Sequence, residues 1–228
     1  MDTPNKTPIY NLVILDKSGS MESIRTEAIN GFNETLASIK ATQDEFAQTQ
    51  EHFISLAAFC NHGIDMIYNM TPINNAEKLT REKYNPCCLT PLFDAIGSTV
   101  NRLKRRISDK PEAVVLVTII TDGQENSSKE WSGQSVCKLI EERKEEGWSF
   151  SFIGAGEDVI KIATTISIKN TMLWKNTTEG TAVMFNAENK ARRSFCCKMA
   201  NSRSILESLE EKKEFLKQLS EEYYDNQN

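Results

Sequence analysis

Residues 12–21 read LVILDKSGSM: an apolar run ends in an aspartate that is followed by two serines at alternate positions. A second apolar run, AVVLVTII at 113–120, is rich in β-branched residues and ends just before Asp122. Apolar runs of this length are typical of parallel strands that are buried on both faces. We therefore expect two central strands whose carboxyl ends carry Asp16 and Asp122.

The rest of the chain alternates between helical and extended patterns. Apolar residues at helical spacing predict helices over about 24–39, 92–107, 131–146 and 158–166. Two extended segments joined by the short turn Asn61-His62-Gly63 predict an antiparallel hairpin at a sheet edge, and further strands are expected at 149–156 and 172–174. Alternating strands and helices predict an α/β sheet.

The length and composition of the chain suit one domain. It has 228 residues and is 39% hydrophobic, which is enough to bury a core without disulfides. The tail from about 179 to 224 reads as helical, with a break near 201–204. We expect an N-terminal extension at 1–9, the domain at 10–200 and a C-terminal helical segment at 201–228.

Charge and cysteine content indicate the partners and the compartment. A net charge of -5 gives no basic footprint, so a nucleic-acid partner is not expected. The start of the chain lacks signal-peptide character and the longest apolar run is too short for a bilayer, so we expect no membrane partner and a cytoplasmic location. The six cysteines lack the spaced pairs of a zinc site and are expected to be reduced.

Two smaller patterns are interpreted as structural. The adjacent Cys87 and Cys88 are expected to be buried, inert thiols rather than redox sensors. The basic residues Lys190, Arg192 and Arg193 are expected to lie on a solvated helix surface.

Oxygen-bearing side chains gather where the two central strands are expected to end. In doubly wound sheets, sites lie outside the carboxyl ends of the strands, at the switch point. Each residue alone has a structural reading: a turn at Asp16 or Asp122, or a helix cap at Ser20 or Thr90. The joint pattern is different, because alternating serines in an extended turn point the same way. It predicts a metal site made by Asp16, Ser18, Ser20, Thr90 and Asp122.

This constellation resembles the metal-ion-dependent adhesion site (MIDAS) of the von Willebrand factor type A (VWA) domain. The family pattern is D-x-S-x-S, a distant Thr and a distant Asp, and LDKSGSM, LTPLFDAIG and TDGQEN match it, in a form similar to stand-alone bacterial cytosolic members. The resemblance implies a Rossmann-like, doubly wound, mostly parallel sheet with an antiparallel edge strand and helices on both faces. It also implies Mg²⁺, with Mn²⁺ or Ca²⁺ as alternatives, and a protein partner that supplies an Asp or Glu to the metal.

Enzymatic readings fit the same residues less well. Ser18 stands where an aspartyl-phosphate phosphatase needs its second carboxylate, and no phosphate-binding GxxxxGK[ST] loop is present. Metal-assisted hydrolysis stays open, but its one candidate general base is Glu125, which reads as a solvated loop residue. We expect a divalent-metal-dependent protein-binding module that is not an enzyme; a metal-independent scaffold is the other alternative. The oligomeric state is left open.

Overall fold

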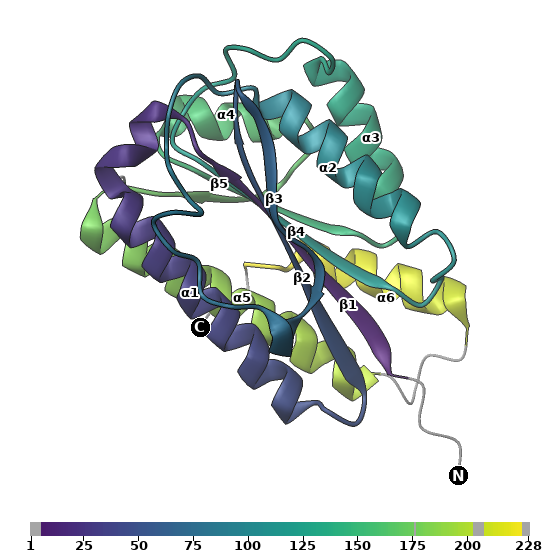
Figure 1. The fold of residues 1–228 in the computed structure, drawn as a ribbon. Helices are drawn as coiled ribbons and strands as arrows, with labels where there is room; N and C mark the ends of the chain where they lie inside the picture. Colours follow the sequence, from purple (N-terminus) through teal and green to yellow (C-terminus); the bar gives the residue numbers. More distant parts are fainter. Residues whose placement is uncertain (1–5, 176, 203–207, 225–228) are drawn as a thin grey trace.

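A six-stranded sheet forms the centre of the molecule (Figure 1), in a computed structural model that describes residues 6–175, 177–202 and 208–224. The strand order is β3-β2-β1-β4-β5-β6. The strands are β1 (Thr7–Asp16), β2 (Gln50–Cys60), β3 (Gly63–Pro72), β4 (Val114–Thr121), β5 (Ser149–Gly154) and β6 (Asn170–Leu173). Residues 1–5 of the expected N-terminal extension lie outside the described residues, and β1 already begins at Thr7.

The two apolar runs form the adjacent central strands, as predicted. β1 and β4 pair in parallel from Ile9 and Val114 to Leu15 and Ile120. Every residue of β4 is buried, because helices cover both faces of the sheet there. β3 pairs antiparallel with β2 at one edge, which confirms the predicted hairpin.

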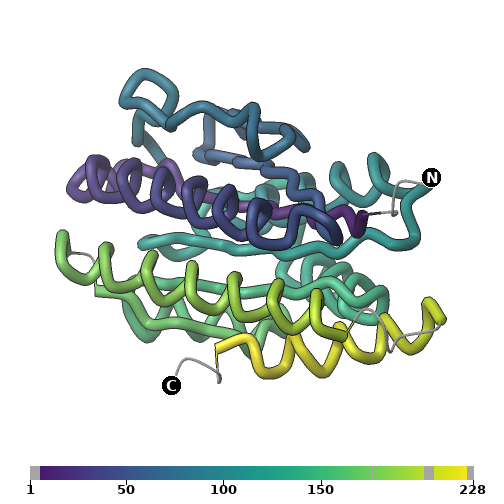
Figure 2. Tube along the Cα trace, turned by 90° about the horizontal axis from the view of Figure 1, so that it is seen from below, coloured from purple at the N-terminus to yellow at the C-terminus, as the bar shows by residue number. Residues whose placement is uncertain are grey.

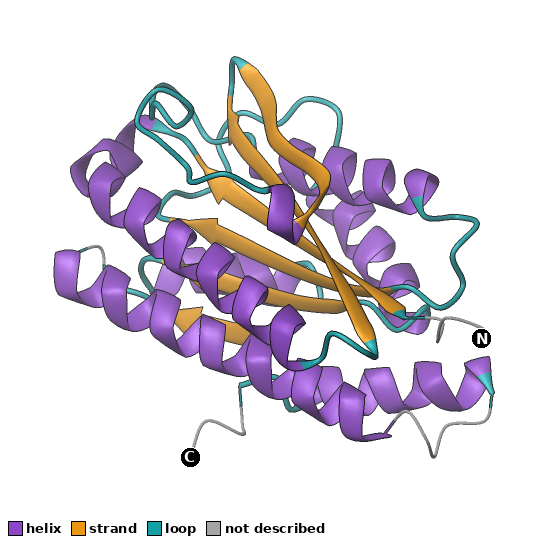
Figure 3. Ribbon diagram, turned by 60° about the horizontal axis from the view of Figure 1, so that its bottom comes forward, coloured by secondary structure: helices purple, strands orange, loops and turns teal. Residues whose placement is uncertain are grey.

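Helices cover both faces of the sheet (Figure 3). Successive residues of a strand point to opposite faces: Leu12 and Ile14 pack towards α2, α3 and α4, while Val13 and Leu15 pack towards α1 and α5. Figure 2 shows α1 and α5 running side by side. The helices are α1 (Arg25–Glu45), α2 (Leu92–Arg106), α3 (Gly133–Glu145), α4 (Glu157–Thr165), α5 (Thr178–Ser202) and α6 (Leu209–Glu221). The predicted fold class is confirmed.

The helical tail packs on the domain. Leu216 and Leu219 of α6 share an apolar cluster with Phe195 of α5 and Ile9 of β1. Of the predicted break near 201–204, positions 203 and 204 lie outside the described residues, and the two before them still belong to α5. Within the described part of the chain, no helix is long and apolar enough to cross a bilayer.

A buried ion pair lies between α5 and the sheet. The prediction that Arg192 lies on a solvated helix surface is therefore wrong. The Arg192 guanidinium is 3% exposed and donates to Glu188 Oε1 at 2.8 Å. It also donates to Asn11 at 2.9 Å and to Thr118 at 2.7 Å. Two tyrosine hydroxyls from the end of the tail donate to the Glu188 carboxylate. We call this set the buried ion-pair cluster: Asn11, Thr118, Glu188, Arg192, Tyr223 and Tyr224.

Candidate metal centre

The five predicted site residues lie at the carboxyl edge of the sheet, where β1 and β4 end side by side. The chain leaves β1 towards α1 on one face, whereas α3, the helix that follows β4, lies on the other face. These two strands therefore flank the switch point at which ligand sites of doubly wound sheets form. We call Asp16, Ser18, Ser20, Thr90 and Asp122 the strand-end cluster.

Asp16 is a fully buried carboxylate that neutral donors hold in place. Its Oδ1 accepts from the Ser18 backbone N–H at 2.6 Å, and its Oδ2 accepts from the Thr121 hydroxyl at 2.6 Å. In the part of the chain that the structure describes, no lysine or arginine forms an ion pair with Asp16. Burial, with a smaller contribution from Asp122, raises the pKa of Asp16 to about 6. The ionised form is thus costly here without a nearby cation.

The two serines connect the loop after β1 to the loop after β4. Ser18 Oγ lies 3.2 Å from Ser20 Oγ, and Ser20 Oγ donates to Asp122 Oδ1 at 2.7 Å. Ser20 lies inside the short 3₁₀ helix η1 (Gly19–Ile24), and the side chain of Ser18, its N-cap residue, makes no capping bond. The capping reading of Ser20 is therefore wrong, since its hydroxyl faces the cluster.

Thr90 presents an unused hydroxyl to the same place. The residue is 3% exposed, and within the described residues its Oγ1 forms no hydrogen bond. It does not cap α2, whose N-cap residue is Pro91. A Cβ added to Gly123 would lie 2.9 Å from Thr90 Oγ1 and 3.5 Å from Asp16 Oδ2. The structure therefore brings all five predicted residues together, and Gly123 leaves room between them.

Three further residues position the cluster, and the sequence analysis missed their roles. The Thr90 N–H donates to Asn126 Oδ1 at 2.8 Å, and the Asn126 N–H donates back to the Thr90 carbonyl at 3.2 Å. The buried Tyr84 hydroxyl donates to the Asp16 carbonyl at 2.7 Å, and Thr121 holds the Asp16 carboxylate. Asn126 stands in the TDGQEN motif, which gave a local signal, whereas Tyr84 lies outside the three motifs.

Glu125 is a loop anchor, so its interpretation as a solvated residue is wrong. Its carboxylate accepts from the backbone N–H groups of Phe93 (2.9 Å), Ser127 (2.9 Å) and Ser128 (2.7 Å), and from the Ser128 hydroxyl (2.6 Å). Asp94 of α2 holds the same loop further along, because its carboxylate accepts from the three backbone N–H groups of residues 129–131. A carboxylate with four donors is poorly placed to take a proton from water.

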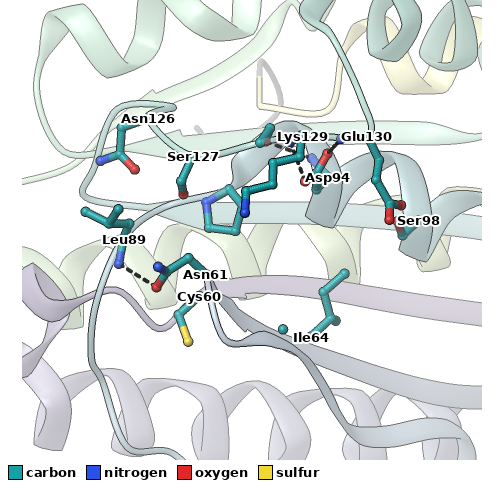
Figure 4. A pocket seen from close by; sticks show the side chains of 13 residues that line it. Cys60, Asn61, Ile64, Leu89, Asp94, Ser98, Asn126, Ser127, Lys129 and Glu130 are labelled. Atoms are coloured by element: carbon teal, nitrogen blue, oxygen red, sulfur yellow. Dashed lines mark hydrogen bonds between the residues drawn. The ribbon is translucent and has the colours of Figure 1, made fainter.

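A groove of about 620 Å³ lies beside the cluster (Figure 4). It is bounded by the β2–β3 turn, the loop that precedes Thr90, the first turns of α2 and the loop after Asp122. Leu89, half exposed at 50%, lies on its wall, where its N–H donates to Asn61 Oδ1 at 3.1 Å. The groove is an open surface next to the strand-end cluster.

The donor set fits a hard divalent cation. The cluster offers two carboxylates and three hydroxyls, and oxygen ligands of this kind suit Mg²⁺, Mn²⁺ or Ca²⁺. A buried carboxylate without a cation and a nearly buried hydroxyl without a hydrogen bond are the features that a bound ion would satisfy.

Comparisons with protein families and with curated proteins find no match to this chain. Solved structures with the same fold include the pilus adhesin SpaC from Lactobacillus rhamnosus GG (13% identity, TM-score 0.59, covering 83% of this chain and 30% of that one). Another is the mussel byssus protein PTMP1 with a zinc-occupied MIDAS motif (12%, 0.54, 84% and 47%). A third is the VWA domain of SpRpn10 (8%, 0.51, 78% and 93%).

These likenesses concern the fold. The chain spans less than half the length of SpaC and of PTMP1, but nearly the whole of the SpRpn10 domain. The chain therefore has the Rossmann-like fold of a VWA domain. The three neighbours are an adhesin, an isolated VWA domain and a thread matrix protein.

Proposed function

We propose that this chain is a divalent-metal-dependent protein-binding module whose strand-end cluster holds Mg²⁺, with Mn²⁺ or Ca²⁺ as alternatives. The observation that carries the proposal is the unused Thr90 hydroxyl next to the buried, cation-free carboxylate of Asp16. Ser18, Ser20 and Thr90 are the proposed hydroxyl ligands, and Asp16 and Asp122 bind the ion directly or through water.

The partner is proposed to supply an Asp or Glu carboxylate. Mg²⁺ gives up its waters reluctantly and is usually held by few carboxylates, so open positions remain for an outside ligand. Two protein carboxylates at most neutralise a divalent ion, and a carboxylate held off by water neutralises it less. The ion would supply local positive charge on a chain whose net charge is -5, so attraction of an acidic group depends on the ion itself.

The groove and the fold neighbours support this reading. A partner that reaches the cluster would lie over the groove, where Leu89 offers an apolar contact at its wall. One neighbour is an adhesin and another carries an occupied MIDAS motif, which favours metal-dependent adhesion over the scaffold alternative. Hydrolysis is disfavoured because Glu125, its candidate base, is fully engaged. A cytoplasmic location stays a prediction from the sequence.

The test is recovery of partners on the immobilised full chain in Mg²⁺ and in EDTA. Ser18→Ala removes a proposed ligand, and Ser108→Ala, at an exposed serine far along the chain, is a control for the same substitution outside the cluster. We expect a partner that is retained by wild type and Ser108→Ala in Mg²⁺ and is lost with Ser18→Ala or EDTA. Changing the partner's contacting Asp or Glu to Asn or Gln should also release it. Full retention in EDTA would place the interface elsewhere.

A further inference from the structure

A second group of metal-ligating side chains lies beside the strand-end cluster. Cys60 ends β2, His62 lies in the β2–β3 turn, and Cys87 lies in the loop that precedes α2. One ligand atom from each of the three lies within 4.8 Å of the other two. Cys88, the next residue, also places its sulfur against His62. We call Cys60, His62, Cys87 and Cys88 the thiol–imidazole cluster.

The separations between these ligand atoms match a tetrahedral zinc site. Zinc binds sulfur at about 2.3 Å and imidazole nitrogen at about 2.0 to 2.1 Å, so tetrahedral ligands lie about 3.8 Å (S to S) and 3.6 Å (S to N) apart. Cys60 Sγ lies 3.7 Å from Cys87 Sγ, and Cys87 Sγ lies 3.9 Å from His62 Nδ1. Both separations are within a few tenths of an ångström of those values.

Cys88 places a third sulfur near the imidazole ring. In an extended chain, consecutive side chains point to opposite faces. Cys88 instead has a left-handed backbone (φ 67°), and its Sγ lies 3.8 Å from His62 Nδ1 and 3.6 Å from Nε2. A non-glycine residue in this conformation is uncommon and tends to occur at functional sites. Here it allows two adjacent cysteines to face one histidine.

The backbone holds the donors together without needing an ion. The Cys87 N–H donates to the Lys17 carbonyl at 2.8 Å, which ties the cysteine loop to the loop after β1. The Asn61 N–H donates to the Leu89 carbonyl at 3.1 Å, which ties the cysteine loop to the β2–β3 turn. Cys60 is buried, Cys87 is half-buried and His62 is exposed, so an ion can enter from the His62 side. The expectation that Cys87 and Cys88 are both buried is wrong, since Cys88 is exposed.

We propose that Cys60, His62 and Cys87 bind Zn²⁺ or a similarly thiophilic divalent ion at a site separate from the strand-end cluster, with the neighbouring Cys88 as the candidate for the fourth ligand. Thiolate and imidazole ligands select such ions, whereas the all-oxygen strand-end cluster suits Mg²⁺. The Cys60 and Cys87 thiolates would neutralise the charge of Zn²⁺, and a third thiolate from Cys88 would leave the complex with one negative charge.

This site lies where a bound ion would help to hold the loops of the strand-end cluster in place. The Gly19 N–H, between Ser18 and Ser20, donates to the Cys88 carbonyl at 3.0 Å, and Thr90 follows Cys88 by two residues. A metal ion joining the β2–β3 turn to Cys87 would therefore restrain two of the three loops that carry the hydroxyl and carboxylate oxygens, the loop that contains Thr90 and, through the backbone hydrogen bonds, the loop after β1.

The test uses Co²⁺ as a spectroscopic probe and Zn²⁺ as competitor on the reduced, metal-stripped full chain, with excess Mg²⁺ present. Tetrahedral cobalt with thiolate ligands gives sulfur-to-cobalt charge-transfer absorption and strong visible bands, which oxygen ligands do not give. We expect one equivalent of Co²⁺ to produce these bands, and one equivalent of Zn²⁺ to remove them.

Variants separate this site from the strand-end cluster and from a folding defect. His62→Gln, at an exposed turn residue, and Cys87→Ser should weaken Zn²⁺ binding by more than about 100-fold, beyond the 10- to 100-fold cost of changes outside the ligand set. Cys137→Ser and Cys197→Ser change thiols of similar exposure elsewhere and should bind normally, as should Ser18→Ala. Absence of charge-transfer absorption in the reduced wild type would overturn the proposal. So would bands that survive both ligand changes, or a Cys60–Cys87 disulfide that forms while Zn²⁺ fails to protect the thiols.

Discussion

The strand-end cluster and the buried ion-pair cluster each place a carboxylate out of water, but they satisfy it differently. Glu188 is 1% exposed and faces the Arg192 guanidinium and two tyrosine hydroxyls from the tail. Asp16 is 0% exposed and accepts from the Ser18 N–H and the Thr121 hydroxyl, and among the described residues no Lys or Arg pairs with it. A carboxylate with its cation inside the protein is a structural element, whereas one without it can bind a cation from solution.

The largest change in unfolding free energy is expected from breaking the buried Glu188–Arg192 ion pair. Arg192→Ala would leave the Glu188 carboxylate buried without a cation, which typically costs about 3 to 5 kcal/mol of unfolding free energy. Arg193→Ala, at the next residue, removes an exposed ion pair with Glu45 and should cost under about 1 kcal/mol. Urea unfolding of both variants measures the difference. Equal stability of the two variants would mean that the guanidinium is not needed to keep Glu188 buried.

A smaller effect is expected at His52, which lies near the buried ion-pair cluster. Burial, with the charge of Arg192, lowers the pKa of His52 to about 4. The unfolded chain therefore binds a proton between about pH 6.5 and 4 that the folded chain does not, so this residue lowers stability as the pH falls through that window.

At roughly 1.4 kcal/mol for each pKa unit, the loss of stability from His52 reaches about 2 to 3 kcal/mol at pH 4.5 and is complete only below about pH 4. The measurement is the unfolding free energy of wild type and His52→Gln from pH 7.5 to 4.5. The wild type should lose stability relative to the variant as the pH falls. Parallel pH profiles would contradict a buried neutral imidazole.

Removing the Asp16 carboxylate should raise the stability of the metal-free protein, whereas breaking the Glu188–Arg192 ion pair lowers it. The folded pKa of Asp16 is raised to about 6, so in the metal-free protein its ionisation destabilises the fold above that pH. The raised pKa corresponds to about 3 kcal/mol, and Asn loses one of the two accepted hydrogen bonds at about 1 to 2 kcal/mol, so we expect Asp16→Asn to be about 1 to 2 kcal/mol more stable than wild type at pH 7.5 in EDTA. The gain should vanish as the pH falls below about 4, where both states are protonated.

Excess Mg²⁺ should reverse the order of stability, so that wild type becomes more stable than Asp16→Asn. A ligand at 100 times its Kd stabilises the protein that binds it by about 2.7 kcal/mol, and Asn cannot replace the charge of Asp16. Asp44→Asn, at an exposed position on α1, should follow wild type under every condition. If Asp16→Asn is destabilised in EDTA, Asp16 serves as an ordinary structural residue.

The smallest effect on stability is expected at Gly123. An alanine Cβ there would lie 2.9 Å from Thr90 Oγ1, so Thr90 must shift by a few tenths of an ångström. We expect Gly123→Ala to change unfolding by less than about 1 kcal/mol, because it lies in a loop, while its Mg²⁺ affinity falls clearly. Unchanged affinity in calorimetry would indicate that Thr90 is not a ligand.

The sequence predicted most of the fold because its signals are local. The apolar runs of β1 and β4, the Asn61-His62-Gly63 turn and the helical spacing of α1 and α2 all lie within single elements. The five oxygen residues were predictable for a similar reason, since Asp16, Ser18 and Ser20 share one motif, Asp122 directly follows the adjacent strand, and Thr90 lies where the chain enters α2. Their roles as ligands remain a prediction.

The remaining features depend on contacts between distant segments. Arg192 lies on a helix with other basic residues, and only its contacts with Asn11 and Thr118 show that it points into the core. The thiol–imidazole cluster joins Cys60-x-His62 to Cys87-Cys88 across the fold, so it lacks the spacing of a zinc motif. Neither is visible in a short window of sequence.

The most direct test of the strand-end cluster compares two threonines that are both 3% exposed. Thr90→Val keeps the shape of the side chain and, since Thr90 Oγ1 forms no hydrogen bond among the described residues, should leave metal-free stability nearly unchanged. Thr99→Val, inside α2, is the matched control. Calorimetric titration with Mg²⁺ and Mn²⁺ should show one site in wild type and Thr99→Val, and no site in Thr90→Val. The same isotherm for all three proteins would contradict a cation site built by the strand-end cluster.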